Sequence, residues 1–342
     1  MKVLGIETSC DETAAGVVED GQRILSNVVA SSIDLHVKYG GVVPEIAARS
    51  HIEVIMPVIE RALTDAKCTW DDIDGIAVTY GAGLGGSLLI GVMTARTLAI
   101  ALGKPLYAIN HVEAHVYANF LTKEQPEFPM LAVIVSGGHS QLVLFQDHFD
   151  YQVLGRTQDD AIGEAFDKVA KILGLPYPGG PSVAKCAEKG NADAFRLPKA
   201  KMGKYDFSFS GLKTAVLRLA QAQVGESFDF PSIKLPERLS EAQKADIAAS
   251  FQRVAVETIV GKVRLACDEF APKSVVVAGG VAASQELRRQ LADALPLPVN
   301  FPVPELCTDN GAMVATLGCF KMKLGQPEAD PYSLSIEPGL SM

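Results

Sequence analysis

The stretch VLGIETSCDETAAGVV (residues 3–18) decides the fold, because two apolar runs flank a short polar turn. Each run has the length and β-branched content of a buried strand, and Gly21 supports a hairpin turn into a third strand over residues 24–31. The turn carries Asp11 and Glu12, which could act as a general base or hold metal-bound water. An ordinary polar hairpin tip also explains these residues, and taken alone they favour that simpler interpretation.

The same plan returns in the middle of the chain. Residues 130–135 form an apolar run, SGGHS (residues 136–140) forms a tight turn, and two strand patterns follow at 141–145 and 151–155. A repeated strand–turn–strand–strand pattern predicts two lobes of one architecture. The small residues of the turn would let the phosphate of a ligand approach the backbone closely.

Chain length and a proline-containing segment indicate a two-lobed protein. A chain of 342 residues is long for one core, and the proline-containing segment 125–129 is the predicted boundary. We therefore expect an N-terminal lobe over residues 1–125 and a C-terminal lobe over residues 126–311.

The formal net charge of -9 argues against nonspecific binding of nucleic acid through a uniformly basic surface.

Cysteine usage and hydropathy predict a cytoplasmic protein without membrane contact. The six cysteines are scattered with no CxxC pair, which is typical of reduced thiols. Glu7 interrupts the first apolar run, so the chain does not begin with a signal-peptide pattern. The apolar stretch over residues 87–102 contains Arg96 and is too short to span a bilayer.

Residues 110–115, with the sequence NHVEAH, follow a strand-like apolar run and form a candidate metal site. His111 and His115 are four residues apart, so on a helix their imidazoles share one face and could bind one metal ion. A lone helical histidine is usually structural. Because two histidines share one face here, a metal-binding role and a structural role are equally well supported. Asp309, just before the last apolar helix, could be a plain N-cap or could complete a two-His, one-carboxylate site.

The position of Glu113 excludes a zinc protease of the HExxH type. In that motif the glutamate comes one residue after the first histidine and lies near the metal. Glu113 comes two residues after His111, which is about 200° round the helix at 3.6 residues per turn. Its carboxylate should therefore point away from both imidazoles.

Two glycine-rich turns between a strand and a helix could bind nucleotide. GAGLGG (residues 81–86) matches GxGxxG, but it is not at the first strand–helix turn, and no acid ends the next strand. We therefore interpret it as close packing. The turn at Gly279 and Gly280 has a nucleotide-binding shape of moderate specificity.

Helical patterns occupy much of the remaining chain. Residues 42–66 are periodic, with a break or kink predicted at Pro57. Residues 159–173 predict an amphipathic helix with an acidic first turn. Ser240 and Gln243 form a capping box that opens a long helix.

Residues 185–218 depart from the overall acidity, with eight basic residues against three acidic ones. Tyr205, Phe207 and Phe209 are interleaved with these charges, and basic and aromatic side chains together are typical of single-stranded RNA recognition. A solvated loop beside a strand with core aromatics explains the segment equally well. The candidate tRNA contacts are Lys199, Lys201, Lys204 and Lys213.

Motifs along the whole chain resemble the universal tRNA threonylcarbamoyladenosine transferase (Kae/Gcp/TsaD) family, once described as O-sialoglycoprotein endopeptidases. The resemblance includes the family signature around residues 96–116. Further motifs are GIETSCDET (5–13), GGVVPE (40–45), SGGH (136–139), GEAFDKVAK (163–171), YPGGP (177–181), FSFSGLKT (207–214) and CTDNGAM (307–313).

The resemblance implies an α/β, actin-like ATPase fold of the sugar kinase, Hsp70 and actin type. It has two RNase H-like lobes around a nucleotide cleft, with the C-terminal helix (312–342) joining the first lobe. His111, His115 and Asp309 would bind one divalent metal, Fe²⁺ in the first place and Zn²⁺ as the alternative. The implied substrate-binding residues, which include the SGGH turn and the turn at Gly279 and Gly280, are Ile134, Val135, Ser136, Gly137, Gly138, His139, Asp167, Gly180, Gly279, Gly280 and Ser284.

Two positions depart from the family pattern. Ser284 stands where relatives usually carry Asn, which puts a contact to adenine or ribose in doubt. Ala82 stands where many relatives have Pro, which should loosen that turn without removing chemistry.

The resemblance also implies the reaction and the partners. Threonylcarbamoyl-AMP would donate its acyl group to the exocyclic amine of the adenine 3′ to a tRNA anticodon, with Asp11 or Glu12 taking the proton. Bacterial relatives work with the TsaB paralogue and the TsaE ATPase in the cytoplasm. Alternatives are a metalloprotease, a small-molecule kinase or ATPase on the same fold, and a non-enzymatic assembly scaffold.

Overall fold

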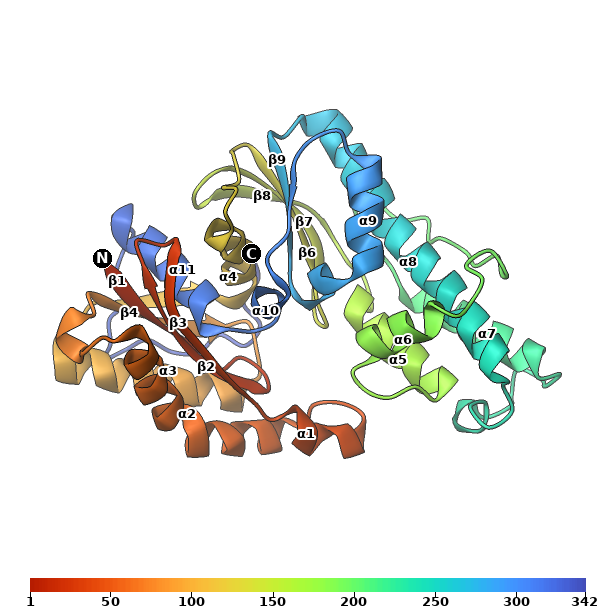
Figure 1. Cartoon of the computed structure of the whole chain (residues 1–342), viewed down its shortest axis with the longest axis horizontal. Helices are drawn as coiled ribbons and strands as arrows, with labels where there is room; N and C mark the ends of the chain where they lie inside the picture. The colour runs from red at the N-terminus through yellow and green to blue at the C-terminus, as the bar shows by residue number, and fades with distance from the viewer. The chain divides into compact units, whose positions relative to one another are not determined.

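The computed structural model describes residues 1–342, which form two compact units (Figure 1). Unit 1 comprises Met1–Gln125 together with Pro302–Met342. Unit 2 comprises Pro126–Phe301. The chain thus leaves unit 1 after Gln125 and returns to it for its last two helices.

The sheet of unit 1 has the strand order β3-β2-β1-β4-β5. The first three strands are antiparallel hairpin neighbours, whereas β4 runs parallel to β1 and β5 runs parallel to β4. The strands predicted around residues 3–31 are confirmed. The strand bounds are β1 (Lys2–Glu7), β2 (Glu12–Glu19), β3 (Arg23–Ser31), β4 (Gly75–Gly81) and β5 (Leu106–Asn110).

Alternate residues of β1 meet different helices. Leu4 and Ile6 belong to an apolar cluster with side chains of α2 and α3, whereas Gly5 faces α11. The sheet of unit 1 is therefore covered on both faces. The helices of unit 1 are α1 (Ile33–His36), α2 (Pro44–Ala66), α3 (Gly85–Leu102), α4 (His111–Tyr117), α10 (Pro304–Cys307) and α11 (Gly311–Lys323), with 3₁₀ turns η1 (Val37–Tyr39), η2 (Trp70–Asp72) and η3 (Ala118–Leu121).

Glycines let α11 lie unusually close to β1 and β2. A Cβ on Gly5 would stand 2.3 Å from the Ala315 nitrogen, and one on Gly311 would stand 2.3 Å from the backbone carbon of Ala15. A Cβ on Gly16 would be 2.8 Å from the Ala312 nitrogen. Only residues without a side chain permit this approach.

Read from its β8 edge, the sheet of unit 2 has the order β8-β7-β6-β9-β10. This matches the order β3-β2-β1-β4-β5 of unit 1, with β6 in the place of β1. The predicted repeat is confirmed. Its strands are β6 (Met130–Val135), β7 (Ser140–Asp147), β8 (Asp150–Arg156), β9 (Ser274–Ala278) and β10 (Val299–Asn300). Its helices are α5 (Ile162–Leu173), α6 (Gly179–Ala187), α7 (Ser210–Gln223), α8 (Glu241–Phe270) and α9 (Gln285–Ala294), with η4 (Ser232–Lys234) and η5 (Gly280–Ala283).

Two local predictions were wrong. Of the break or kink predicted at Pro57, the break is absent: α2 continues through the proline, because the buried residues Ile55, Val58 and Ile59 hold it to the core on both sides. The helix predicted from residue 159 begins only at Ile162, because Asp159 accepts hydrogen bonds from the Phe209 and Ser210 amides. The capping box of Ser240 and Gln243 is present at the start of α8.

α3 begins at Gly85 and is the one helix long and apolar enough to cross a membrane by length and composition, so the expectation that this stretch is too short was wrong. It packs instead against β4 and α2, with Leu88, Val92 and Ala95 buried. The Arg96 guanidinium donates to backbone carbonyls of the C-terminal segment, at Pro331, Tyr332 and Leu334. These contacts describe a core helix.

Replacing Gly5 with alanine should destabilise unit 1. The added methyl group would force α11 away from β1, and overpacking of this kind costs about 1–3 kcal/mol. Urea unfolding followed by circular dichroism would measure the loss in the free energy of unfolding. Gly41→Ala is the matched control, since nothing lies within 4 Å of its added Cβ. Equal stability of both variants would contradict the close packing of α11.

Candidate metal centre

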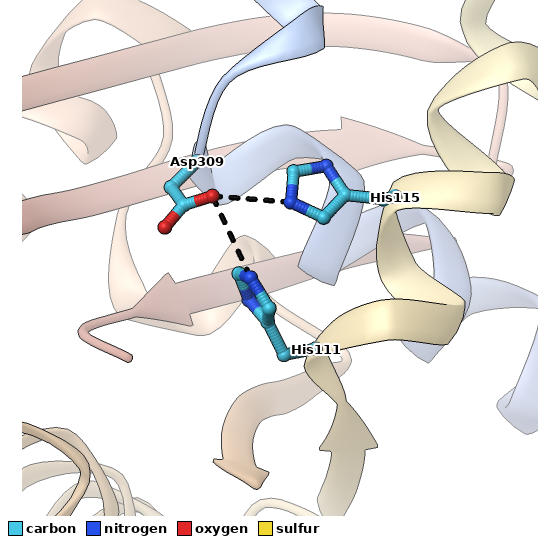
Figure 2. Close-up of side chains that lie close together, drawn as sticks. All are labelled: His111, His115 and Asp309. Carbon is cyan, nitrogen blue, oxygen red and sulfur yellow. Dashed lines mark hydrogen bonds and ion pairs between the residues drawn. The ribbon is translucent and has the colours of Figure 1, made fainter. Parts of the chain in front are cut away.

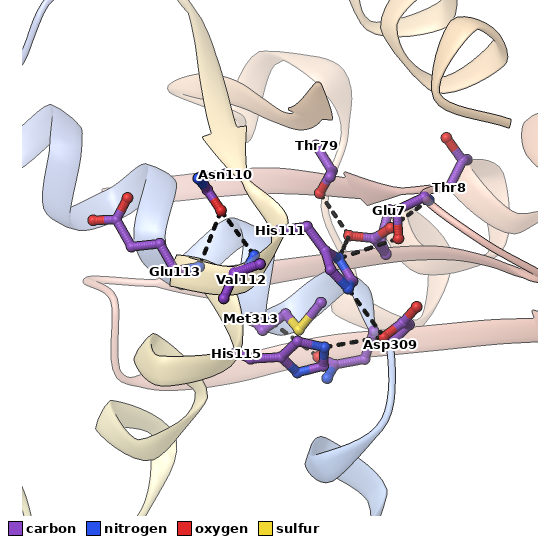
Figure 3. Close-up of polar contacts among 12 residues, drawn as sticks. Glu7, Thr8, Thr79, Asn110, His111, Val112, Glu113, His115, Asp309 and Met313 are labelled. Atoms are coloured by element: carbon purple, nitrogen blue, oxygen red, sulfur yellow. Dashed lines mark hydrogen bonds and ion pairs between the residues drawn. The ribbon is translucent and has the colours of Figure 1, made fainter. Parts of the chain in front are cut away.

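The histidine pair is positioned by the cap of α4. The Asn110 side chain, at the end of β5, accepts hydrogen bonds from the Val112 and Glu113 amides at 2.9 and 3.3 Å. The helix therefore starts at His111, and His111 and His115 lie one turn apart with ring centroids 4.7 Å from each other. Figure 3 shows both rings on the same side of α4.

Asp309 reaches the two imidazoles from the segment just before α11. Its Oδ1 lies 3.1 Å from Nε2 of His115 and 3.6 Å from Nε2 of His111 (Figure 2). The helix cap is Asn310, which accepts from the Met313 amide at 2.9 Å, so the N-cap interpretation of Asp309 was wrong. The Asp309 carboxylate is thus available to the cluster.

The spacing of these three residues fits a metal ion. Their ligand atoms all lie within 4.8 Å of one another. Ligand distances of about 2.0–2.2 Å put adjacent ligand atoms of one ion roughly 3.0–3.6 Å apart, which matches the contacts of Asp309. Two imidazoles and one carboxylate suit iron, zinc and other transition metals.

The cluster is electrostatically coupled. Burial disfavours the charged form of Asp309, but the neighbouring imidazoles outweigh it and hold the pKa of that carboxyl well below its usual range. Burial likewise opposes protonation of His111, but Asp309 and Glu7 outweigh it and raise the pKa of the imidazole to about 9. The carboxylates of Asp309 and Glu7 therefore stabilise a positive charge at the His111 imidazole.

Glu113 lies on the other side of α4, as the helix geometry predicted (Figure 3). It is buried, which raises the pKa of its carboxyl, while Lys321 opposes that rise. The Glu113 carboxylate therefore cannot serve as the base of a zinc protease at the histidine pair.

Asp11 and Glu12 lie at the start of β2, in the turn that the opening stretch predicted. Burial, together with the negative charges of Asp309 and Asp11, raises the pKa of Glu12 to about 9. Ser31 donates a hydrogen bond to Glu12 at 3.3 Å. The electrostatic coupling between Glu12 and Asp309 places this acid in the neighbourhood of the metal cluster.

His51 supports the same turn and was missed in the sequence. Its Nε2 donates to the Cys10 carbonyl at 3.0 Å, so its Nδ1 accepts from the Thr13 hydroxyl at 2.7 Å. Burial lowers the pKa of His51. Only its spacing from the core residues Ile55 and Ile59 signalled that the side chain faces inward.

Several predicted substrate residues come together in unit 2, at the ends of the parallel strands β6 and β9. Ile134 and Val135 are buried in β6, so their side chains belong to the core. Gly279 has φ 90°, and a Cβ there would lie 2.5 Å from the Val135 carbonyl oxygen. The turn over residues 136–139 therefore lies beside the glycine turn, and the Ser136 amide donates to the His139 carbonyl at 2.8 Å.

The remaining candidates surround α5 and α9. Asp167 accepts from the Gly179 amide at 2.7 Å, and burial raises the pKa of its carboxyl. Ser284 caps α9 by accepting from the Leu287 amide at 3.4 Å. The glycines Gly137, Gly138, Gly180 and Gly280 have open space where a side chain would stand.

In the basic segment the aromatics belong to the core. Tyr205, Phe207 and Phe209 are at most 8% exposed, so their rings are not available for stacking on bases. Three of the four lysines form ion pairs within unit 2, and Lys201 is exposed. The pairs are Lys199 with Glu257, Lys204 with Glu269, and Lys213 with Asp160.

Close packing explains GAGLGG, as predicted. A Cβ on Gly81 would meet the Glu337 carbonyl oxygen, and one on Gly83 would meet the Ser9 backbone. The Gly83 amide donates to the Pro338 carbonyl. The C-terminal segment therefore covers this turn.

Comparison with known sequences gives extended matches. The model of the family described as "TsaD: tRNA N6-adenosine threonylcarbamoyltransferase" matches residues 23–316. The protein of that name from Thermomicrobium roseum is 51% identical over 329 residues, covering 92% of this chain and 90% of the relative. The one from Dehalococcoides mccartyi is 49% identical over 343 residues, covering 100% and 99%.

Solved structures confirm the predicted actin-like ATPase fold. Full-length HypF matches with a TM-score of 0.58 and 14% identity, over 95% of this chain and 47% of HypF. Component A of the (R)-2-hydroxyglutaryl-CoA dehydratase of Acidaminococcus fermentans matches with a TM-score of 0.52 and 17% identity, over 95% and 99%. At these identities the likeness concerns the fold alone.

His51 should make the protein sensitive to acid. Its pKa in the folded chain lies below the ordinary 6.5, so its contribution to stability is present above pH 6.5 and is lost as the pH falls toward the folded pKa. Glu7 and Asp11 face it and moderate the shift. Thermal unfolding of wild type and His51→Gln between pH 8 and about pH 5 should show a Tm difference that shrinks in acid. A constant difference would refute this prediction.

Proposed function

The chain belongs to the tRNA N6-adenosine threonylcarbamoyltransferase family, and on that premise we propose that His111, His115 and Asp309 hold its divalent metal ion. The reaction moves the threonylcarbamoyl group of threonylcarbamoyl-AMP to N6 of the adenine 3′-adjacent to the anticodon. Its substrates are tRNAs that read ANN codons, and AMP is released.

One observation carries the metal proposal. Two imidazole nitrogens from α4 and one carboxylate oxygen from before α11 converge, although Asp309 is 194 residues beyond His115. We propose Fe²⁺ as the ion, with Zn²⁺ as the alternative for the same donor set. The bound ion would supply Lewis-acid polarisation of the acyl carbonyl.

The acyl transfer also needs a proton acceptor. A bond forms between N6 and the carbamoyl carbon, the bond from that carbon to the phosphate oxygen breaks, and AMP leaves with the electron pair. The amine proton goes to Glu12 or Asp11. Glu12 is the better candidate because it interacts electrostatically with Asp309, and a cation held by Asp309 would lower the raised pKa of Glu12 and leave it ionised to accept the proton.

We assign binding of the AMP moiety to the turns of unit 2. The open space at Gly137, Gly138 and Gly280 would let phosphate oxygens reach backbone N–H groups. The hydroxyl of Ser284 already caps α9, so it replaces only part of what an asparagine could offer to adenine or ribose. Units 1 and 2 would then be the two lobes of the enzyme, one for the metal and one for the nucleotide.

The surface of unit 1 carries exposed apolar side chains that could bind a protein partner. The packed helices α2 and α3 each expose an apolar pair at i, i+4, Ile52 with Met56 and Leu89 with Met93. These side chains are 41–62% exposed, which is typical of a contact surface. We propose that the TsaB paralogue binds here, that TsaE joins the complex, and that the assembly works in the cytoplasm. Lys201 remains a candidate tRNA contact.

Removing a metal ligand should abolish transfer and metal binding together. His111→Ala and Asp309→Asn are compared with wild type in a mixture of the partner proteins, tRNA, threonine, bicarbonate and ATP. Mass spectrometry of the digested tRNA detects the modified nucleoside, and elemental analysis measures bound metal. Glu113→Gln is the control and should keep both. Full activity in a His111→Ala protein without metal would rule out the metal assignment.

The same assay separates the rival functions. Nucleotide turnover without tRNA would favour a small-molecule kinase or ATPase, and chelator-sensitive cleavage of a glycoprotein would favour a protease. Unchanged modification by all site variants would favour a scaffold.

Glu12→Gln should lower the transfer rate while metal binding persists, because only the proton acceptor is changed.

Charging the apolar surface should prevent complex formation. In Ile52→Asp/Met93→Asp, two carboxylates would be desolvated on binding, so affinity for the TsaB paralogue should fall by at least 100-fold, on the order of 3 kcal/mol. Analytical ultracentrifugation would measure the loss. Ile233→Asp, at a side chain 80% exposed in unit 2, is the control. Equal binding by both variants would place the partner elsewhere.

A further inference from the structure

Glu7 is a buried acid for which the proposed chemistry gives no role. It ends β1 and has no exposed surface. A buried carboxylate is costly unless hydrogen-bond donors surround it. Each oxygen of Glu7 has such a donor, which indicates that its negative charge is retained in the fold.

The contacts of Glu7 are specific at the level of single atoms. Oε1 accepts from the Ser9 amide at 2.5 Å, and Oε2 accepts from the Thr79 hydroxyl at 2.6 Å. Nδ1 of His111 lies 3.1 Å from the same Oε2 (Figure 3). A carboxylate only accepts hydrogen bonds, so Nδ1 must carry a proton to bond with it, and the Ser9 hydroxyl oxygen, also 3.1 Å from Nδ1, is then a second acceptor for the same proton.

We propose that Glu7 is a positioning residue for the metal site: it accepts Nδ1–H of His111, so that Nε2, on the Asp309 side of the ring, is the nitrogen that gives up its proton and binds the metal ion. This inference rests on the proposed metal function. A carboxylate on the distal nitrogen of a ligating histidine fixes the tautomer and the ring orientation, and it increases the basicity of the ligand.

The contrast with His115 supports this assignment. Nδ1 of His115 is buried without a hydrogen-bond partner, so only packing and Asp309 orient that ring. His111 is therefore the pre-oriented ligand of the pair. Glu7 is not a fourth ligand, because both of its oxygens are engaged and it contacts the distal nitrogen of the imidazole.

Strand register explains how Glu7 is held. β1 and β4 are parallel, with Ile6 paired to Val78, so Glu7 and Thr79 are neighbours at the same edge of the sheet. Thr79 is buried as well. The Thr79 hydroxyl has donated its hydrogen to Oε2, which keeps that oxygen an acceptor facing His111.

Glu7→Gln tests the tautomer directly, because an amide has one acceptor end and one donor end. If the amide oxygen keeps the Ser9 contact, the NH₂ group faces His111 and favours the tautomer with a proton on Nε2, which cannot bind metal. If the amide is reversed, its NH₂ group meets the Ser9 N–H. Either arrangement weakens the metal-binding geometry without changing the size of the side chain.

The measurement is calorimetric titration of Zn²⁺ into the metal-free full-length protein. Loss of an outer hydrogen-bond partner of a ligand costs about 10–100-fold in metal affinity, and Glu7→Gln should show that loss. Glu113→Gln, which changes a second buried acid that does not touch the imidazoles, should bind like wild type. Unchanged zinc affinity of Glu7→Gln, with only a lower melting temperature, would make Glu7 purely structural and overturn the proposal.

Nitrogen NMR of the zinc-loaded wild type gives a test that needs no folded variant. In protein labelled with ¹⁵N-histidine, His111 should coordinate through Nε2 and keep a hydrogen-bonded proton on Nδ1. Coordination through Nδ1 would overturn the proposal. If His111→Ala binds zinc as wild type does, the metal function fails; if His111→Ala loses zinc but Glu7→Gln does not, only the role of Glu7 fails.

Discussion

The close contact between α11 and the first hairpin is the constraint on which the metal centre depends. Gly5, Gly16 and Gly311 leave no side chain at the points of closest approach, so the helix lies against the backbone of β1 and β2 there. Asp309 stands two residues before α11, and the Asn310 cap fixes where the helix begins. The distance between helix and sheet therefore sets the position of the carboxylate relative to the imidazoles, which enter from β5 and α4. A methyl group added at this contact would lower the stability of unit 1 and would also shift Asp309 relative to the two imidazoles.

Register and charge complete the centre. The pairing of β1 with β4 places Glu7 beside Thr79, and the Asn110 cap places His111 at the first position of α4. Glu7, Asp309 and Glu12 then lie around two imidazoles in a largely buried space, where burial first and the charges of Asp309 and Asp11 second raise the pKa of Glu12. A protonated His111 offsets these negative charges in part, and a divalent cation would offset them further. Affinity for a cation at the proposed site would thus come from the charge distribution as well as from the ligand geometry.

Local sequence patterns predicted the parts of this structure that depend on neighbours along the chain. The strands of both hairpins, the capping box at Ser240, and the shared face of His111 and His115 follow from periodicity and helix geometry. Contacts that depend on register could not be derived in this way: Glu7 looked like an interruption of a strand, and His51 looked like one more helical residue. The break at Pro57 was mispredicted for a related reason, and the choice between RNA-binding and core aromatics in the basic segment stayed open, since tertiary packing decided both.

The two units show how one topology supports different chemistry. β1–β2 of unit 1 and β6–β7 of unit 2 are equivalent hairpins in sheets of the same strand order. In unit 1 the connecting turn carries Asp11 and leads into Glu12, beside imidazoles and a carboxylate brought by α4 and the α11 segment. In unit 2 the equivalent turn is Ser136–His139, where Gly137 and Gly138 leave the backbone open. Since backbone N–H groups favour phosphates and clustered carboxylates favour cations, the proposed division between a nucleotide site and a metal site would follow from which residues occupy the same turn in each unit.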